Sequence, residues 1–237
     1  MRKKILTIAP VMPQQSDIES IASTLSFLEV VYQIDFIDPL AINETFSVNT
    51  SNEVYYQLWQ DHLKKWLANY DAFFGFSFGG VILQQCFSLF ANSKKPIVLF
   101  STPTFADNAL QKKLGDVIAL CKANRVNDAL ISLYKEVFSP NEAPLQILPE
   151  NRVISAANRL IFGLQRVLDT DATAILEQTT VDHLHLIGEC SALVNKENVL
   201  APGIGDLCIV PQAGMRVLQD NPSYCKKLIL ERLNSET

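Results

Sequence analysis

The segment Gly75-Phe76-Ser77-Phe78-Gly79 has the clearest chemical meaning in this sequence. It follows the pattern glycine, any residue, serine, any residue, glycine, and it separates two apolar stretches, 71–76 and 78–91. A strand that turns sharply into a helix holds such a serine in a strained conformation with its hydroxyl exposed. Larger side chains two residues before and after the serine would collide in so tight a turn. The pattern therefore predicts a nucleophilic serine, Ser77.

The residues beside Ser77 predict how the serine would be supported. The N–H group of Phe78 lies at the start of the expected helix, where free N–H groups favour negative charge. That position suits a donor of an oxyanion hole. Phe76 and Phe78 flank the serine with aromatic rings, and together with the apolar composition they predict a largely apolar pocket.

Short apolar runs alternate with longer amphipathic segments along most of the chain. We expect strands at 5–9, 30–37, 71–76, 97–101, 183–188 and 207–211. We expect helices at 16–27, 54–67, 78–91, 156–168 and 222–233, with a short one near Asn195. This alternation predicts an α/β fold with a mostly parallel sheet and helices on both faces. Functional residues then gather at the carboxyl ends of the strands.

One long region interrupts the alternation. From Pro103 to Arg159 no segment has the pattern of a strand, whereas Leu110, Leu114 and Val117 recur at helical spacing. We therefore expect a core formed by residues 1–102 and 160–237, with a helical insertion at 103–159.

With these features the chain resembles the α/β-hydrolase family, from Lys4 to about Leu233. It looks most like small acyl-ester hydrolases of the pimeloyl-carrier methyl esterase type. Besides the serine motif, the segments Leu160–Val194 and Gln212–Pro222 are similar to the family's last loops. The resemblance implies that the insertion 103–159 is a cap that covers the pocket.

The same resemblance exposes two substitutions. The position of the family's acid is occupied by Ser191, and the position of its general-base histidine is occupied by Met215. A thioether does not accept a proton near neutral pH. The histidine and glycine that follow the family's first core strand correspond to Ala9 and Pro10, and Val11 would supply the second oxyanion N–H.

Few other side chains in the sequence could fill the roles of acid and base. The three histidines, His62, His183 and His185, are interpreted as structural, because the expected elements place them away from Ser77. Asp107, beyond the strand at 97–101, is a candidate for a displaced acid. Cys190 is expected beside the pocket, as a small apolar filler.

Composition narrows the class of protein. The formal net charge of −5 disfavours a general nucleic-acid binder, and no apolar run reaches the roughly 18 residues of a membrane helix. Five scattered cysteines without metal-ligand spacing favour free thiols in a reducing compartment, so we expect a cytoplasmic protein without metal or cofactor. The sequence identifies no protein partner.

Three functional hypotheses remain open. The first is a hydrolase-fold protein that cleaves esters weakly or not at all and binds an acyl chain, another apolar small ligand or a partner. The second is an active ester or thioester hydrolase that uses Ser77 with a base from water, the substrate or another chain. The third is a lyase or transferase on the same fold.

Overall fold

The computed structural model describes residues 2–41 and 50–234, and within these ranges the strands form one six-stranded sheet. Its order is β2-β1-β3-β4-β5-β6, and every neighbouring pair is parallel. The strands are β1 (Lys3–Ile8), β2 (Tyr32–Ile37), β3 (Ala72–Phe76), β4 (Ile97–Phe100), β5 (His183–Gly188) and β6 (Gly205–Val210). The predicted parallel sheet is confirmed. The strand order reverses at β1 and β3, and ligands bind beyond such a switch point in open α/β sheets.

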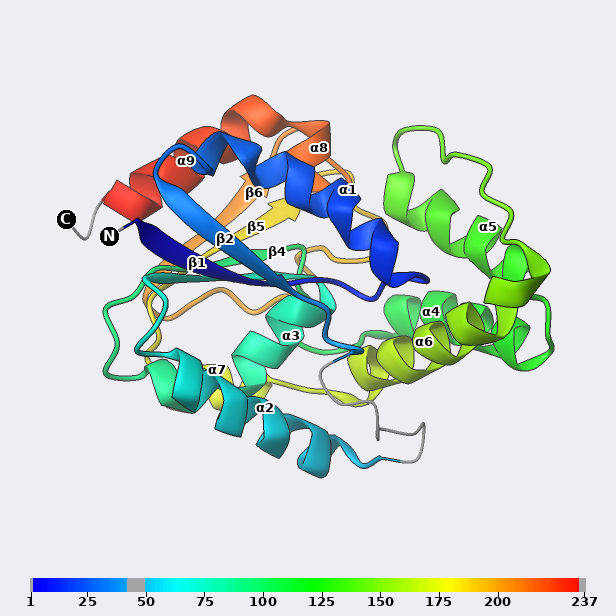
Figure 1. Ribbon diagram of the computed structural model, residues 1–237, viewed down its shortest axis with the longest axis horizontal. Coiled ribbons are helices and arrows are strands. Elements are labelled where there is room, and N and C mark those ends of the chain that lie inside the picture. The colour runs from blue at the N-terminus through cyan, green and yellow to red at the C-terminus, as the bar shows by residue number, and fades with distance from the viewer. Residues whose placement is uncertain (1, 42–49, 235–237) are drawn as a thin grey trace.

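Helices cover both faces of this sheet (Figure 1). On one face lie α1 (Ile18–Ala22), α8 (Val217–Asp220) and α9 (Pro222–Asn234). On the other lie α2 (Asn52–Trp66), α3 (Phe78–Gln85) and α7 (Thr173–Gln178). Two helical layers around a parallel sheet explain why the inner strands are continuously apolar: all five residues of β3 are buried.

Three further helices follow β4 and project to one side of the sheet (Figure 1). They are α4 (Asn108–Lys122), α5 (Val126–Phe138) and α6 (Glu150–Asp169). Helix α4 packs against both α5 and α6. Helix α6 runs without a break through residue 159, so the expected boundary between insertion and core falls inside this helix.

Neighbouring residues of each strand point to opposite faces of the sheet and enter two separate cores. Leu6 and Phe73 contribute to the core beneath α2 and α3, which continues into the three-helix insertion. Ile5 and Phe74 contribute to the core beneath α1 and α9. The first core therefore connects the sheet to the insertion.

Several predicted helices differ from those observed. Within 16–27, only Ile18–Ala22 is α-helical, between 3₁₀ turns at Gln15–Asp17 and Ser23–Leu28. Helix α3 ends at Gln85, and a 3₁₀ turn at Phe87–Phe90 follows. The short helix expected near Asn195 is wrong. The Asn195 carboxamide oxygen accepts a hydrogen bond from the N–H of Glu197 at 2.9 Å, which favours a turn over a helix.

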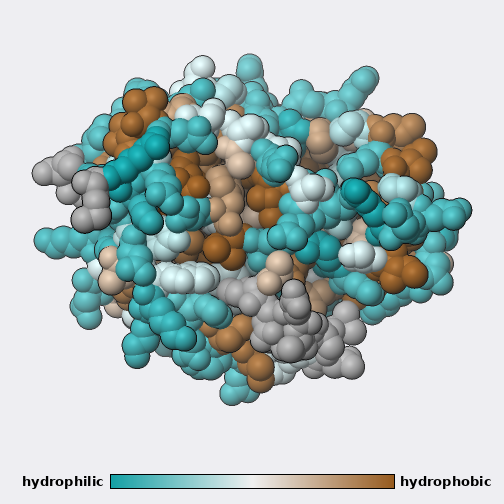
Figure 2. Space-filling model, viewed as in Figure 1, coloured by the Kyte–Doolittle hydropathy of each residue, from teal (hydrophilic) through white to brown (hydrophobic). Residues whose placement is uncertain are grey.

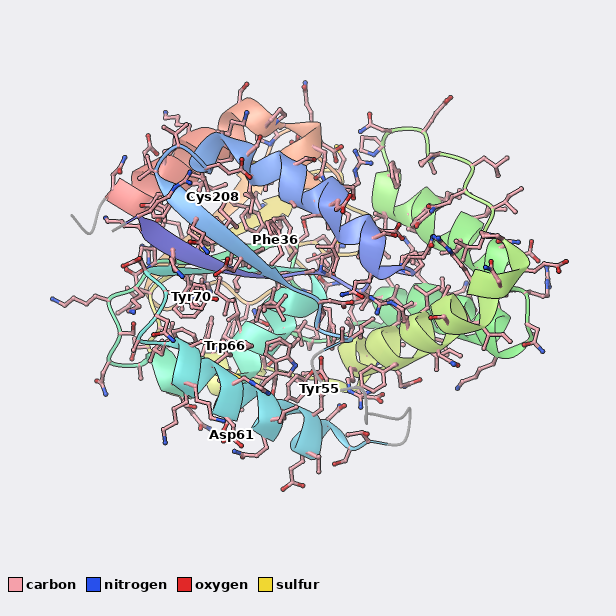
Figure 3. All side chains as sticks on the ribbon, in the orientation of Figure 1. Phe36, Tyr55, Asp61, Trp66, Tyr70 and Cys208 are labelled. Carbon is pink, nitrogen blue, oxygen red and sulfur yellow. The ribbon has the colours of Figure 1, made fainter. Side chains whose placement is uncertain are left out.

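The surface is mainly hydrophilic, with separate hydrophobic patches, on the face in Figure 2. Helix α2 illustrates the division between core and solvent. It supplies both Tyr55, which is buried, and Asp61, which is exposed (Figure 3). Among the helices in the described ranges, none is long and apolar enough to cross a membrane.

Candidate active site

Ser77 occupies the turn between β3 and α3, as the sequence motif predicts. Its backbone has φ 48° and ψ −109°, a left-handed φ that is unfavourable for a residue with a side chain. The N–H of Ser77 donates to the carbonyl of Phe100 at 2.8 Å, which continues the β3–β4 ladder into the turn. The serine is thus held at the carboxyl edge of the sheet.

Only glycine fits at positions 75 and 79 of the motif, because a side chain at either position would collide with nearby backbone atoms. A Cβ on Gly75 would lie 2.6 Å from the Cα of Gly80. A Cβ on Gly79 would lie 2.1 Å from the carbonyl oxygen of Ile8, at the end of β1. The close approach of α3 to the ends of both strands therefore requires glycine.

Aromatic contacts fix the residues on either side of the serine. Phe76 and Phe100 are register partners in β3 and β4, and their rings stack with centroids 4.2 Å apart. Phe78 stacks on Tyr55 of α2 with centroids 5.9 Å apart. These contacts hold the start of α3 in place.

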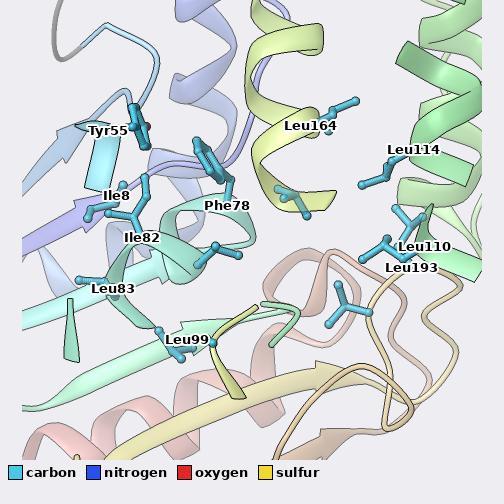
Figure 4. Close-up of a cluster of buried hydrophobic side chains, with 14 of the residues drawn as sticks. Ile8, Tyr55, Phe78, Ile82, Leu83, Leu99, Leu110, Leu114, Leu164 and Leu193 are labelled. Atoms are coloured by element: carbon cyan, nitrogen blue, oxygen red, sulfur yellow. The ribbon is translucent and has the colours of Figure 1, made fainter. Parts of the chain in front are cut away.

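A cavity of about 510 Å³ lies between the carboxyl edge of the sheet and the helical insertion. Ser77, Phe76 and Val11 contribute to its lining. Four leucines from α4, α6 and the loop after β5 also line it, and Figure 4 shows them near one another in the buried cluster: Leu110, Leu114, Leu164 and Leu193. The volume and the apolar lining are typical of a small-molecule site.

Within the described part of the chain, the Ser77 hydroxyl makes no hydrogen bond, and no histidine lines the cavity. All three histidines of the sequence lie in the ranges that the structure describes. The ring of His62 lies against Trp66, with centroids 5.1 Å apart. The other two are buried in β5.

His185 is engaged in the structure of the sheet. Its Nε2 accepts a hydrogen bond from the N–H of Thr102 at 3.2 Å, so the neutral ring has its proton on Nδ1. Burial, together with the nearby His183, lowers the pKa of His185 to about 3. Burial also lowers the pKa of His183, whose Nδ1 lies 2.8 Å from the carbonyl oxygen of Val181. Neither ring is placed to take a proton from Ser77.

Ser191 and Met215, at the positions where the resemblance expects acid and base, are neighbours. The Ser191 hydroxyl oxygen lies 4.0 Å from the Met215 sulfur and accepts a hydrogen bond from the N–H of Val194 at 3.2 Å. Met215 lines the cavity together with Ser77. The loops after β5 and β6 therefore bring Ser191 and Met215 together. Neither side chain can act as a general base or as the acid that orients one.

The two expected oxyanion donors flank the serine turn. Within the described ranges, the N–H groups of Val11 and Phe78 donate no hydrogen bond to the backbone or to a side chain. Val11 packs on α6, where a Cβ added to Gly163 would lie 2.5 Å from a Val11 methyl carbon. A donor of an oxyanion hole needs an N–H group without another partner, so the predicted role of both residues stays a prediction.

Sequence reasoning missed several polar residues that line the cavity, among them Ser101 and Arg216. Ser101 follows β4, has φ 45° and is 2% exposed, and its hydroxyl has no hydrogen-bond partner in the described part of the chain. Arg216 places its guanidinium 3.9 Å from the ring centroid of Phe138 and 4.0 Å from Asp220. A polar residue directly after a strand was the available signal for Ser101.

Two further titratable groups line the cavity. Burial raises the pKa of Asp17, although the N–H of Gln14 and the nearby Arg159 and Arg152 oppose the shift. Burial, reinforced by Asp17, raises the pKa of Tyr134 to about 12. Among the described residues that line the cavity, Asp17 is the only one with a carboxyl group.

Two other sequence candidates, Cys190 and Asp107, are not among the described residues that line the cavity. Cys190 is exposed and is absent from the described lining of the cavity. Asp107 caps α4 by accepting a hydrogen bond from the N–H of Leu110 at 2.8 Å, which gives it a structural role.

A more open cleft of about 720 Å³ lies among Lys3, Asp71 and Lys95, near the opposite edge of the sheet.

Comparison with known proteins supports the fold. Neither the known family profiles nor the curated protein sequences give a match to this chain. Among solved structures, an esterase from Exiguobacterium antarcticum is similar with a TM-score of 0.71 and 13% identity, over 98% of this chain and 91% of the esterase. A bromoperoxidase from Bacillus anthracis is similar with a TM-score of 0.69 and 14% identity, over 98% and 92%.

A third similar structure comes from an enzyme described as an alpha/beta hydrolase. It is MGS-M2, an alpha/beta hydrolase enzyme from a Medee basin deep-sea metagenome library, with a TM-score of 0.64 and 13% identity over 97% of this chain and 88% of that one. The finer likeness to the pimeloyl-carrier methyl esterase type stays a prediction. The serine turn, the parallel sheet and these similarities together establish that this chain has the α/β-hydrolase fold.

Proposed function

We propose that this protein binds an acyl chain or a similar apolar small molecule in the cavity above Ser77 and hydrolyses esters weakly or not at all. The observation that carries the proposal is the surroundings of the Ser77 hydroxyl. No histidine lines the cavity among the described residues, and the base position holds Met215.

The chemical consequence of this arrangement is large. A serine hydroxyl is a weak nucleophile until a neighbouring base accepts its proton. In a serine protease, loss of that base lowers turnover by about 10⁶-fold, while the oxyanion hole and binding leave a residual acceleration of about 10³- to 10⁴-fold. With Met215 in place of a histidine, ligand binding is therefore expected to be retained far better than turnover.

The lining of the cavity supports an apolar ligand. Leucines from α4, from α6 and from the loop after β5 surround the space beside Ser77: Leu110, Leu114, Leu164 and Leu193. Ser77, Ser101 and Arg216 add polar groups to this otherwise largely apolar lining, and Val11 lies beside them. This combination suits a molecule with an apolar chain and one polar head.

Hydrolysis of p-nitrophenyl octanoate by the wild type and by Ser77→Ala tests the proposal. We expect both rates to remain close to the uncatalysed background. The matched control is Ser93→Ala, because Ser93 lies at the open cleft near the other edge of the sheet. A wild-type turnover above about 1 s⁻¹ that is lost only in Ser77→Ala would show an active esterase instead.

The strained geometry of Ser77 favours a second candidate function, an active ester or thioester hydrolase with a non-standard base. A left-handed φ at this position costs about 1–3 kcal/mol and serves nucleophilic attack in active members of such folds. Asp17 is the carboxylate that lines the same cavity among the described residues. If this candidate is correct, ester cleavage is measurable and falls in both Ser77→Ala and Asp17→Asn.

A further inference from the structure

Ser101 continues β4 beside Ser77, so the two serines form a pair at the edge of the sheet. Their predecessors, Phe76 and Phe100, are register partners. The Ser77 N–H donates to the carbonyl of Phe100 at 2.8 Å, and the Ser101 N–H donates to that of Leu186 at 2.8 Å. Adjacent strands lie about 4.8 Å apart, so the two serines follow neighbouring strand ends.

The environment of Ser101 is unusual for a serine that serves only the fold. The residue adopts a left-handed φ of 45°, is only 2% exposed, and lines the cavity. Its hydroxyl has no hydrogen-bond partner in the described part of the chain. Buried hydroxyls are almost always satisfied, so this one indicates a missing partner. A rotation about the Cα–Cβ bond is enough to redirect the hydroxyl among its staggered positions.

Several polar groups beside Ser77 can donate hydrogen bonds. The N–H groups of Val11 and Phe78 donate to no described group, and the hydroxyls of Ser77 and Ser101 each have a proton to donate. An ionised carboxylate is an acceptor with two oxygens and about four lone-pair sites. The start of the eight-residue helix α3 also favours negative charge there.

We infer that Ser101 is a ligand-positioning residue that, with Ser77, holds the carboxylate of an unesterified acyl chain whose tail lies among the leucines of the cavity. This inference rests on the proposed ligand-binding function and assigns its ligand class. Of the two charged residues in the described lining, Asp17 has a hydrogen-bond partner, whereas the buried Nε of Arg216 has none within the described part of the chain. Arg216 lies beside Asp220, and Asp17 accepts a hydrogen bond from the N–H of Gln14 at 3.1 Å.

Calorimetric titration with sodium octanoate and with 1-octanol tests the inference on the full chain. The wild type is expected to bind octanoate more tightly than 1-octanol. Ser101→Ala should weaken octanoate binding about tenfold, because it removes a hydrogen bond to a charged group, and should change 1-octanol binding by less than about twofold. Ser93→Ala is the control with unchanged affinities.

A second variant separates the hydroxyl from the strained backbone. Glycine adopts a left-handed φ freely, so Ser101→Gly preserves the turn even if Ser101→Ala folds poorly. It should show the same selective loss of octanoate binding. Equal losses for both ligands, or no loss for octanoate, would overturn the role of Ser101 while leaving an apolar cavity. Failure of the wild type to bind either ligand would overturn the ligand-binding function itself.

Discussion

The hydroxyl oxygen of Ser191 lies 4.0 Å from the sulfur of Met215. The two residues belong to loops that follow β5 and β6, which are adjacent strands of the sheet. Met215 also lines the cavity that contains Ser77. A contact between these two positions is what an acid needs to orient a base, so the geometry for the pair is present although both side chains lack the chemistry.

Restoring that chemistry should restore ester cleavage. The double variant Ser191→Asp with Met215→His is expected to raise hydrolysis of p-nitrophenyl octanoate by about 10²-fold or more over the wild type, because a positioned general base contributes about 10²- to 10⁴-fold. The gain should disappear when Ser77→Ala is added.

The single variant Met215→Leu serves as a control for altered packing and should gain nothing. A well-folded double variant whose rate stays at the wild-type level would mean that the position of Met215 does not serve Ser77.

The serine turn should tolerate a methyl group poorly at Gly79. A Cβ there would meet the Ile8 carbonyl oxygen at 2.1 Å, and backbone atoms cannot move aside easily. We expect Gly79→Ala to reduce the free energy of unfolding by about 3 kcal/mol, measured by urea denaturation. Gly115 is the matched control, because it lies in α4 with nothing within 4 Å of an added Cβ. Gly115→Ala should stabilise the protein by about 1 kcal/mol, and equal effects would contradict the close approach of α3 to β1.

The ion pair between Arg159 and Asp38 should anchor the insertion to the sheet. Arg159 donates to both carboxylate oxygens of Asp38, at 3.1 and 2.9 Å, and to the carbonyl of Met12 at 2.9 Å. Because the Asp38 side chain is 4% exposed, Arg159→Ala leaves a buried charge without its partner. The expected loss is about 3 kcal/mol of unfolding free energy.

The comparison variant for this ion pair is Arg125→Ala. Arg125 pairs with Asp128 at 2.8 Å on the surface, with both side chains at least half exposed. Its loss should cost about 1 kcal/mol or less. Similar denaturation midpoints for the two variants would show that the Arg159–Asp38 pair does not hold α6 in place.

His185 should make the protein less stable as the pH falls. Burial lowers its pKa to about 3 in the folded state, whereas an unfolded histidine titrates near about 6.5. Between these values the unfolded chain binds more protons, so stability is complete above the unfolded pKa and falls with pH by about 1.4 kcal/mol per unit for this group. His185→Gln, whose carboxamide oxygen can still accept from Thr102, should lose about 2 kcal/mol less between pH 6.5 and pH 5. Identical pH profiles in urea denaturation would exclude His185 as the cause.

Much of the fold was predictable because its determinants are local. Continuous apolar runs identified the buried strands, and β5 has the predicted bounds, His183–Gly188. The short helix α7 and the turns around Asn195 were not predicted, because a few residues carry too little periodicity and side-chain hydrogen bonds compete with the helix.

The sequence by itself determined the serine turn, since the glycines around Ser77 are required by steric clashes within a few residues of chain and beside it. It also determined that Met215 cannot act as a base, which is a property of the thioether. Only the tertiary structure decided that Ser101 lies beside Ser77 and that Ser191 contacts Met215. The members of each pair are 24 residues apart and follow different strands. Such neighbours depend on strand order and register, which local sequence patterns do not encode.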